Sequence, residues 1–220
     1  MSIMAIIAIL RALLIWPLIA VIFAGLILAG KVHGPWNFYW FFAMGCWFIL
    51  DAYWVQAALT TKPIIPPAQY RLAVISSAVI HLLYCLPLSS VPIVGQEILP
   101  RFTWLRILGA LLCAGGVGVA IWARHILAGN WNAAVSLQKR HTLVQAGPYA
   151  VVRHPIYLGF LLAALGMFLV LGEVRGLVCL CHVTQFFNKI RFEEDVLRKT
   201  YPDEYPDYER RVKRLVPCIW

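Results

Sequence analysis

Three side chains that can do chemistry stand at the start of a long apolar segment. The stretch AVVRHPIYLGF, residues 150–160, sets Arg153, His154 and Tyr157 around Pro155. Pro155 suits the first turn of a helix, where its missing N–H leaves no hydrogen bond unmade. The free N–H groups of that turn, beside a guanidinium and an imidazole, favour a carboxylate or another anion. A simpler interpretation is that Arg153 only contacts lipid headgroups.

A second set of ionisable residues lies in the C-terminal part. Four apolar residues there share one face of a helix that leaves the membrane: Phe186, Phe187, Ile190 and Leu197. Lys189 and Glu193 are four positions apart, so they are neighbours on that helix, whereas Glu194 and Asp195 are expected to face solvent. On spacing alone, Lys189 and Glu193 could equally form a surface ion pair worth less than about 1 kcal/mol.

The composition of the chain indicates the environment in which these residues lie. The chain has 220 residues, of which 61% are hydrophobic and 13% charged, with a mean hydropathy of +0.76. These values indicate an all-α integral membrane protein. The formal charge of +9 and the basic tail indicate contact with membrane lipids rather than nucleic acid. The sequence contains no CxxC pair and no Cys/His metal-ligand spacing, so no metal is expected.

The apolar runs predict six transmembrane helices. Four runs are long enough to span a bilayer: Ile3 to Ala29, Trp36 to Leu59, Tyr70 to Leu88, and Phe102 to Leu127. The first run is too long for a signal peptide and is expected to be a retained helix. A fifth run, Pro155 to Phe187, is too long for one span, and it is interrupted by Gly172, Glu173, Arg175 and Gly176. A tight hairpin there gives two spans.

Lys and Arg residues orient these spans. With six spans, most basic residues fall on the side that holds both chain ends, so both termini are predicted to be cytoplasmic. The loop after the fourth span and the C-terminal tail lie on that same side and are the longest polar segments. We therefore expect a single domain, 1–220, with motif-free spans in 1–100 and a functional region in 128–217.

The polar segments together resemble the isoprenylcysteine carboxyl methyltransferase family. The matching blocks occur in the family's order: Gly129-Asn130-Trp131-Asn132, His141-Thr142-Leu143-Val144, Gly147, Tyr149, Arg153-His154-Pro155, Tyr157-x-Gly159, Glu193-Glu194, Tyr201-x-Asp203-Glu204-Tyr205-x-x-Tyr208, Arg211-Val212 and Leu215-x-Pro217. The resemblance covers about residues 128–217.

This resemblance implies an S-adenosyl-L-methionine site in a cytoplasmic pocket formed by the loop after the fourth span and the tail. The residues that would line the pocket are His141, Leu143, Val144 and Tyr149. Arg153, His154 and Glu193 would contact the charged end of the cofactor. Tyr157 would lie where the cofactor meets a lipophilic substrate that enters from the bilayer.

The resemblance also implies a cationic anchor for the substrate carboxylate. The family places an Arg four residues before the Glu that matches Glu193, and here that position is Lys189. Arg191 is near but lies about 200° around the helix from Lys189. Lys provides a point charge where Arg provides a bidentate fork, so Lys189 and Arg191 both remain candidates.

The resemblance favours methyl-ester formation on an isoprenylcysteine α-carboxylate. Such a carboxylate has a pKa of about 3.5 and needs no general base at neutral pH. The runner-up reaction is N-methylation of phosphatidylethanolamine, with Glu193 or Glu194 as base, and a third is methylation of a small thiol or lipid. Outside methyl transfer, the sequence is compatible with a sterol-reductase-like enzyme that binds a nicotinamide cofactor. It is also compatible with a transporter, which would place its ionisable residues near the bilayer midplane.

Overall fold

The protein is helical throughout the part that the structure describes. A computed structural model describes residues 37–60, 80, 83–84, 88–127, 143–182 and 185–216. The elements are α3 (Phe38–Thr60), η2 (Leu88–Ser90), α5 (Thr103–Leu127), η4 (Gly147–Ala150), α6 (Pro155–Leu171), α7 (Val174–His182), α8 (Gln185–Thr200) and α9 (Tyr205–Arg211). No β-strand occurs among these residues, which confirms the predicted all-α class.

Helices α5 and α6 pack so closely that their backbones touch. A Cβ added at Gly116 would lie 2.5 Å from the carbonyl oxygen of Gly159, and one added at Gly159 would lie 2.5 Å from that of Gly116. Gly109 makes the same approach to Gly166 further along the two helices, at 2.6 Å. Small residues let membrane helices approach in this way and gain van der Waals contact. This pair of helices is the rigid centre of the fold.

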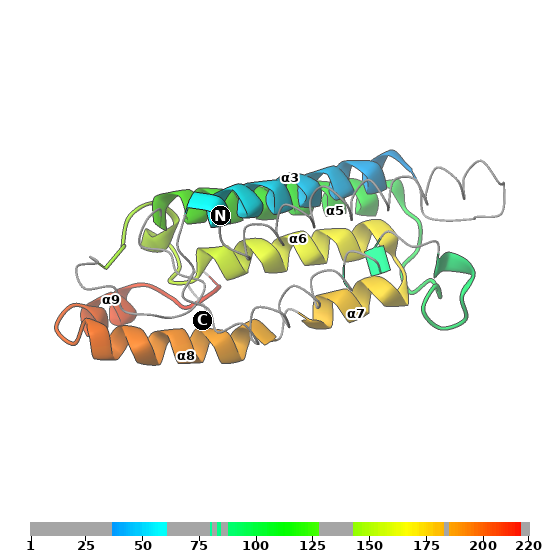
Figure 1. Ribbon diagram of the computed structural model, residues 1–220. Coiled ribbons are helices and arrows are strands. Elements are labelled where there is room, and N and C mark those ends of the chain that lie inside the picture. The colour runs from blue at the N-terminus through cyan, green and yellow to red at the C-terminus, as the bar shows by residue number, and fades with distance from the viewer. Residues whose placement is uncertain are drawn as a thin grey trace.

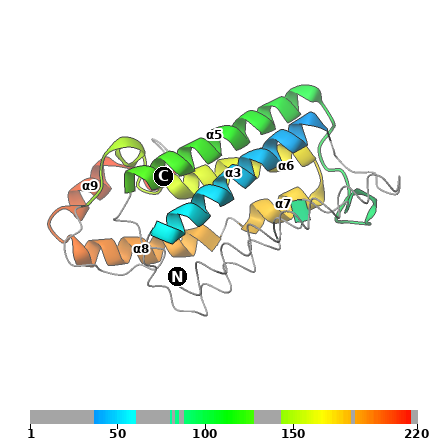
Figure 2. The same ribbon diagram turned by 45° about the horizontal axis from the view of Figure 1, so that its top comes forward.

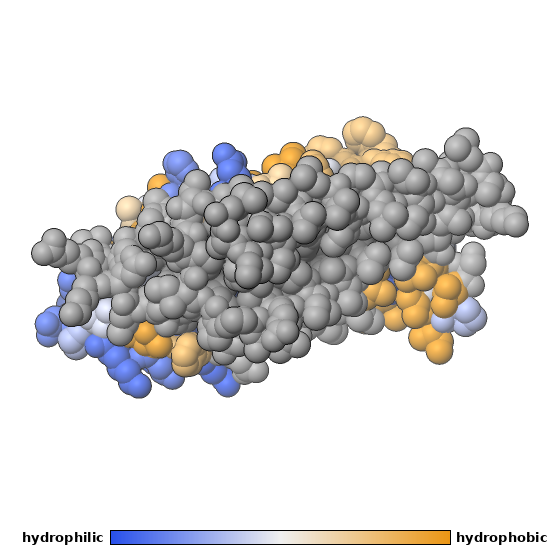
Figure 3. Space-filling view, in the orientation of Figure 1, coloured by the Kyte–Doolittle hydropathy of each residue, from blue (hydrophilic) through white to orange (hydrophobic). Residues whose placement is uncertain are grey.

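Helix α3 lays one face on that centre and leaves the other exposed. The buried face consists of Trp40, Ala43, Met44, Trp47 and Leu50, which share the core with Cys113, Ala163 and Met167. The exposed residues of α3 are also apolar: Phe38, Phe41, Phe42, Phe48 and Ile49. In Figure 3, hydrophobic residues line the middle and right of the upper edge, where α3 and α5 lie, and most hydrophilic residues lie at the lower left, near α8 and α9. This distribution suits a helix bundle in lipid.

The predicted hairpin after Pro155 turns at the expected residues. Helix α6 ends at Gly172, which has the left-handed φ of 67° that favours glycine at a helix C-cap. The carbonyl oxygen of Gly172 accepts hydrogen bonds from the amides of Ile98 and Leu99. Directly after the turn, Arg175 Nε lies 2.7 Å from Glu173 Oε2, and both side chains are fully buried. This buried ion pair therefore stabilises the end of the bundle at the turn between α6 and α7.

The predicted spans agree with the structure in part. Helices α3 and α5 coincide with the runs Trp36 to Leu59 and Phe102 to Leu127 to within about two residues. In the described part of the chain, α5 is the one helix long and apolar enough to cross a membrane, while α6 has 17 residues. Helix α7 is described over nine residues, Val174–His182, and residues 183–184 lie outside the described part, so the second span of the hairpin stays a prediction. The run Ile3 to Ala29, and most of Tyr70 to Leu88, lie outside the described residues.

The polar elements gather at one end of the bundle. Figures 1 and 2 show the start of α6, the outer part of α8, and α9 together at this end, while the turn between α6 and α7 lies at the other. Helices α7 and α8 follow each other along the flank of α6 (Figure 1). The fold thus brings residues 143–158 and 189–216 side by side, as the two polar segments of the sequence predict.

Candidate functional site

The loop before α6 and the C-terminal tail form one backbone unit. Gly147 has a φ of 62° and opens the short helix η4. Further along, the amide of Arg153 donates to the carbonyl of Lys213 at 2.8 Å, and that of His154 donates to Arg214 at 3.1 Å. This parallel bridge sets the directions of the Arg153 and His154 side chains at the N-terminus of α6.

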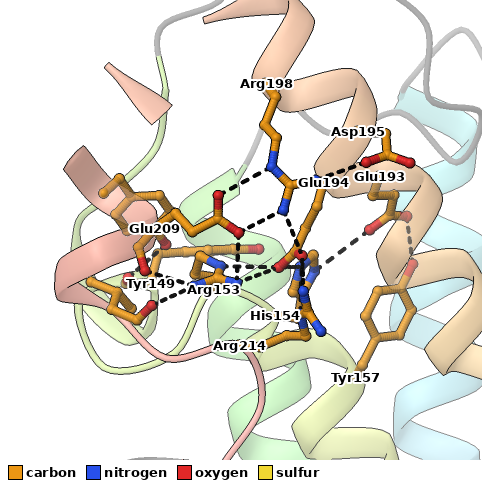
Figure 4. A network of polar contacts seen from close by, with 12 residues as sticks. Tyr149, Arg153, His154, Tyr157, Glu193, Glu194, Asp195, Arg198, Glu209 and Arg214 are labelled. Carbon is orange, nitrogen blue, oxygen red and sulfur yellow. Dashed lines mark hydrogen bonds and ion pairs between the residues drawn. The ribbon is translucent and has the colours of Figure 1, made fainter. Parts of the chain in front are cut away.

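Glu194 lies at the centre of a network of cations (Figure 4). Its Oε1 accepts from Arg153 Nη2 at 2.7 Å and from Arg153 Nε at 3.0 Å, and it lies 3.2 Å from His154 Nε2. Its Oε2 accepts from Arg214 Nη2 at 2.6 Å. Arg198 lies at the rim of the network, 3.7 Å from Oε2. The Glu194 carboxylate therefore joins α8 to the residues at the start of α6 and to the C-terminal tail.

The expectation that Glu194 faces solvent is wrong. The residue is 0% exposed, whereas the side chain of its neighbour Asp195 is 64% exposed, as predicted. Burial alone would raise the pKa of Glu194, but hydrogen bonds from His154, Arg214 and Arg153 outweigh burial and hold the pKa well below its usual range. Burial of this charge is tolerated because the counter-charges come from segments distant in the sequence.

The guanidinium of Arg153 is bound by protein on all sides. Besides Glu194, its Nη1 donates to the carbonyl oxygens of Val212 at 2.7 Å and Glu209 at 3.0 Å. Its Nη2 also lies 3.4 Å from Glu209 Oε1. Arg198 holds the Glu209 carboxylate from the other side, at 2.6 Å, and this ion pair lowers the pKa of Glu209. Arg153 is thus the point where the end of α9 attaches to α6.

Glu193 faces a different group of side chains. Its Oε1 accepts a hydrogen bond from Tyr157 Oη at 2.5 Å, and its Oε2 lies 3.7 Å from His154 Nδ1. Its side chain is 22% exposed, so this carboxylate remains within reach of a ligand. Lys189 Nζ lies 5.6 Å from the centre of the Tyr157 ring, within the range of a cation–π contact. The structure therefore groups Glu193, His154, Tyr157 and Lys189.

The residues predicted to line the cofactor pocket lie partly in this region. Tyr149 is buried, its carbonyl oxygen accepts from Tyr208 Oη at 2.8 Å, and its own hydroxyl is buried without a hydrogen-bond partner among the described residues. Burial raises the pKa of Tyr149, and the neighbouring Tyr208 and Glu193 raise it further. Leu143 packs against Tyr205, Tyr208 and Val212, and Val144 is half-buried. His141 lies outside the described residues.

Sequence reasoning missed three members of the network. Arg214 belongs to the basic tail, for which the sequence predicts contact with membrane lipids, and no sequence pattern predicts a role for Glu209 or Arg198. Glu209 contacts Arg153, 56 positions earlier in the sequence, and Arg214 binds Glu194, 20 positions earlier. For Glu209 and Arg214 the only signal available was the charged run YERRVKR, one acidic residue followed by four basic ones, which is equally typical of a solvated segment. Arg191, a candidate anchor, is exposed on α8.

Known proteins resemble the part of the chain that contains α6 and α8. Residues 104–204 match the family described as phospholipid methyltransferase. The mouse protein-S-isoprenylcysteine O-methyltransferase is 34% identical over 125 residues, which is 55% of this chain and 44% of that protein. The enzyme of the same name from Schizosaccharomyces pombe is 38% identical over 97 residues, 43% of this chain and 39% of that one. Over about half of its length, the chain is therefore similar to protein-S-isoprenylcysteine O-methyltransferases.

A solved structure of an isoprenylcysteine carboxyl methyltransferase has a similar fold. The eukaryotic intramembrane Ras methyltransferase ICMT superimposes with a TM-score of 0.52 and 22% identity, covering 81% of this chain and 68% of that one. At this identity the likeness establishes a common fold. The chain spans less than half the length of the mouse and S. pombe relatives. Among the described residues no group of three His, Cys, Asp or Glu side chains could hold a metal ion.

Proposed function

We propose that the protein transfers a methyl group from S-adenosyl-L-methionine to a lipophilic acceptor, the α-carboxylate of an isoprenylcysteine-type substrate. The observation that carries this proposal is the cluster of Glu193, His154, Tyr157 and Lys189 at the start of α6. The cluster combines one accessible carboxylate with one accessible cation, within residues 104–204, which match the phospholipid methyltransferase family.

The residues of the site suit this cofactor. S-adenosyl-L-methionine carries an ammonium, a sulfonium and a carboxylate, and when bound it supplies an electrophilic methyl group. Glu193 offers a partly exposed carboxylate to the cationic groups. The buried hydroxyl of Tyr149, unpaired among the described residues, offers a hydrogen bond to a polar group of the ligand. We propose that Leu143 and Val144, with His141, cover the apolar parts of the cofactor.

The chain's own residues then have to orient the acceptor and exclude water. An isoprenylcysteine carboxylate is already ionised at neutral pH, so Glu193 need not remove a proton. Lys189, exposed beside Tyr157, is placed to hold the acceptor carboxylate. Tyr157, packed on Phe186 with ring centroids 4.9 Å apart, forms an apolar wall against water. Alignment of nucleophile and methyl group in a dry site accounts for much of the acceleration such an enzyme needs.

The surroundings of the site suit an acceptor that arrives from lipid. We propose that α3, α5 and α6 cross the membrane as three of six spans, with the site and both termini on the cytoplasmic side. Supporting this, apolar side chains cover the outer faces of α3 and α5, while charged residues concentrate on α8 and α9. A single domain, with its motif-bearing region in 128–217, would let the polar cofactor and the apolar acceptor enter from different phases.

The proposal is tested with purified protein in lipid, radiolabelled S-adenosyl-L-methionine and a farnesylcysteine analogue. We expect label in a base-labile methyl ester, and loss of that label in the Glu193→Gln variant. The matched control is Asp195→Asn, because Asp195 is an exposed carboxylate two positions along the same helix. Wild-type protein that neither binds the cofactor nor forms any methylated product would refute the proposal.

A second candidate function is N-methylation of a phospholipid headgroup, which the description of the matching family favours. An amine acceptor must lose a proton, and Glu193 is the carboxylate placed to accept it. The same assay separates the two functions. Label found only in phosphatidylethanolamine, with activity rising as the amine deprotonates, would select the N-methyltransferase and reject the ester-forming reaction.

A further inference from the structure

Glu194 is too deeply enclosed to reach a ligand. Its side chain is 1% exposed, and each carboxylate oxygen already has cationic partners. We infer that Glu194 is a positioning residue, which fixes Arg153 and His154 and through His154 orients Glu193, and that Arg153 makes no contact with the cofactor. This inference rests on the proposed function and revises the direct contact that the sequence led us to expect for Arg153.

Every donor nitrogen of Arg153 points to another part of the protein. Its side chain is 7% exposed, and Nε, Nη1 and Nη2 all face atoms of Glu194, Glu209 and Val212. A cofactor carboxylate could bind this guanidinium only by displacing one of them. Displacement would leave the buried Glu194 charge short of a partner, which is costly in a low-dielectric site. Lys189 and Arg191 are exposed cations on α8 that meet no such penalty.

The link from Glu194 to Glu193 runs through one imidazole. His154 Nε2 lies 3.2 Å from Glu194 Oε1, and Nδ1 lies 3.7 Å from Glu193 Oε2. Glu194 therefore determines how the ring is turned, and the ring borders the carboxylate that is free to meet a ligand. Tyr157 completes the arrangement by its hydrogen bond to the other oxygen of Glu193. Small shifts of such a group can cost about a hundredfold in rate.

Glu194 also holds both segments of the backbone bridge. It binds Arg153 and His154 on one segment and Arg214 on the other. Between the two segments, the amides of Arg153 and His154 donate to carbonyl oxygens of the tail. Neutralising Glu194 should loosen this bridge even when no ligand is present. The role of Glu194 can thus be measured without the cofactor.

The first test is a double-mutant cycle on binding of S-adenosylhomocysteine, measured by calorimetry below the melting temperature of every variant. Arg153→Gln and Glu194→Gln should each weaken binding by about a hundredfold, and the double variant should bind no worse than the weaker single one. Arg210→Gln and Asp195→Asn, in exposed ion pairs, are the matched controls and should bind normally. Additive losses would show that Arg153 contacts the ligand independently and would overturn the inference.

The KM values for the cofactor and for the acceptor, measured separately, distinguish a positioning role of Glu194 from a general distortion of the site. Glu194→Gln should raise KM for the cofactor and leave KM for the farnesylcysteine analogue unchanged, because Lys189 does not depend on Glu194. Equal increases in both constants would indicate a global distortion and contradict the positioning role.

The second test uses the ligand-free protein. Hydrogen exchange at the amides of Arg153 and His154 should accelerate in Glu194→Gln, and should stay at the wild-type rate in Asp195→Asn and Glu193→Gln. Unchanged exchange in Glu194→Gln would overturn the inference whether or not the cofactor binds. Failure of wild-type protein to bind S-adenosylhomocysteine would instead remove the proposed function, and the exchange result would still decide the role of Glu194 in fixing the bridge.

Discussion

Tyr157 Oη donates a 2.5 Å hydrogen bond to Glu193 Oε1 and thereby connects the first turn of α6 to α8. The donor is fixed by a buried ring, while the acceptor is partly exposed. This contact holds the one carboxylate of the Glu193-Glu194 pair that a ligand can reach. Ligand affinity should therefore depend on it.

Tyr157→Phe should weaken binding of S-adenosylhomocysteine by about tenfold to a hundredfold, because a hydrogen bond to a charged group contributes about 1.5–3 kcal/mol. The ring remains, so the packing against Phe186 should survive. Calorimetry in detergent measures the affinity. Tyr205→Phe is the control, since the buried Tyr205 hydroxyl has no hydrogen-bond partner among the described residues. Equal losses in both variants would contradict the assigned contact.

The stability provided by Glu194 should depend on pH in the acid range. The folded protein holds the pKa of Glu194 below its usual value, so the contribution is complete above the unfolded pKa of about 4.3 and disappears as pH falls through the folded value. The difference in melting temperature between wild type and Glu194→Gln should therefore be constant from pH 7 to about pH 5 and shrink below about pH 4. A difference that grows on acidification would contradict the ion network.

Contact between α5 and α6 can be tested with two adjacent glycines. A Cβ at Gly116 would clash with Gly159 and Ala163, whereas one at Gly115 meets nothing within 4 Å in the described structure. Gly116→Ala should lower stability by about 1–3 kcal/mol through overpacking. Gly115→Ala should be neutral or stabilise by up to about 1 kcal/mol through helix propensity. Thermal unfolding in one detergent measures both, and equal shifts would place the helix contact elsewhere.

Local patterns explain which parts of this structure could be predicted from the sequence. The start of α6 at Pro155, the αL turn at Gly172 and the inward face of α8 at Ile190 all follow from residues close in the chain. Glu194 could not be placed in the same way. Because Glu194 is next to the exposed Asp195, the sequence predicts that it also faces solvent. Ion pairs with Arg153 and Arg214, 41 and 20 positions away, hold its side chain in the interior instead.

The same limit applies to the site. The sequence brought His154, Tyr157 and Glu193 together because the motifs of one family contain them, and the structure places these three in contact. It could not separate the roles of Arg153 and His154, which are adjacent. Only the course of the tail, with the carbonyls of Glu209 and Val212 facing Arg153, reveals that this guanidinium is engaged by protein.

The acceptor anchor is the last prediction, and it compares Lys189 with Arg191. Both cations are exposed on α8, but Lys189 lies over the Tyr157 ring beside Glu193, whereas Arg191 projects about 200° further round the helix. A carboxylate anchor must carry positive charge near the reacting group, so Lys189→Gln should raise KM for a farnesylcysteine analogue by about tenfold, and Arg191→Gln by less than about twofold.

Lys189→Arg should restore the low KM in part, because the charge returns with a longer, forked side chain. Cofactor affinity should be unchanged in Arg191→Gln, which makes it the matched control for loss of charge on this helix. A larger KM increase in Arg191→Gln would move the anchor to the other side of α8. Equal KM values in all variants, with label entering only phosphatidylethanolamine, would mean that the acceptor is an amine, which needs no cation to hold it.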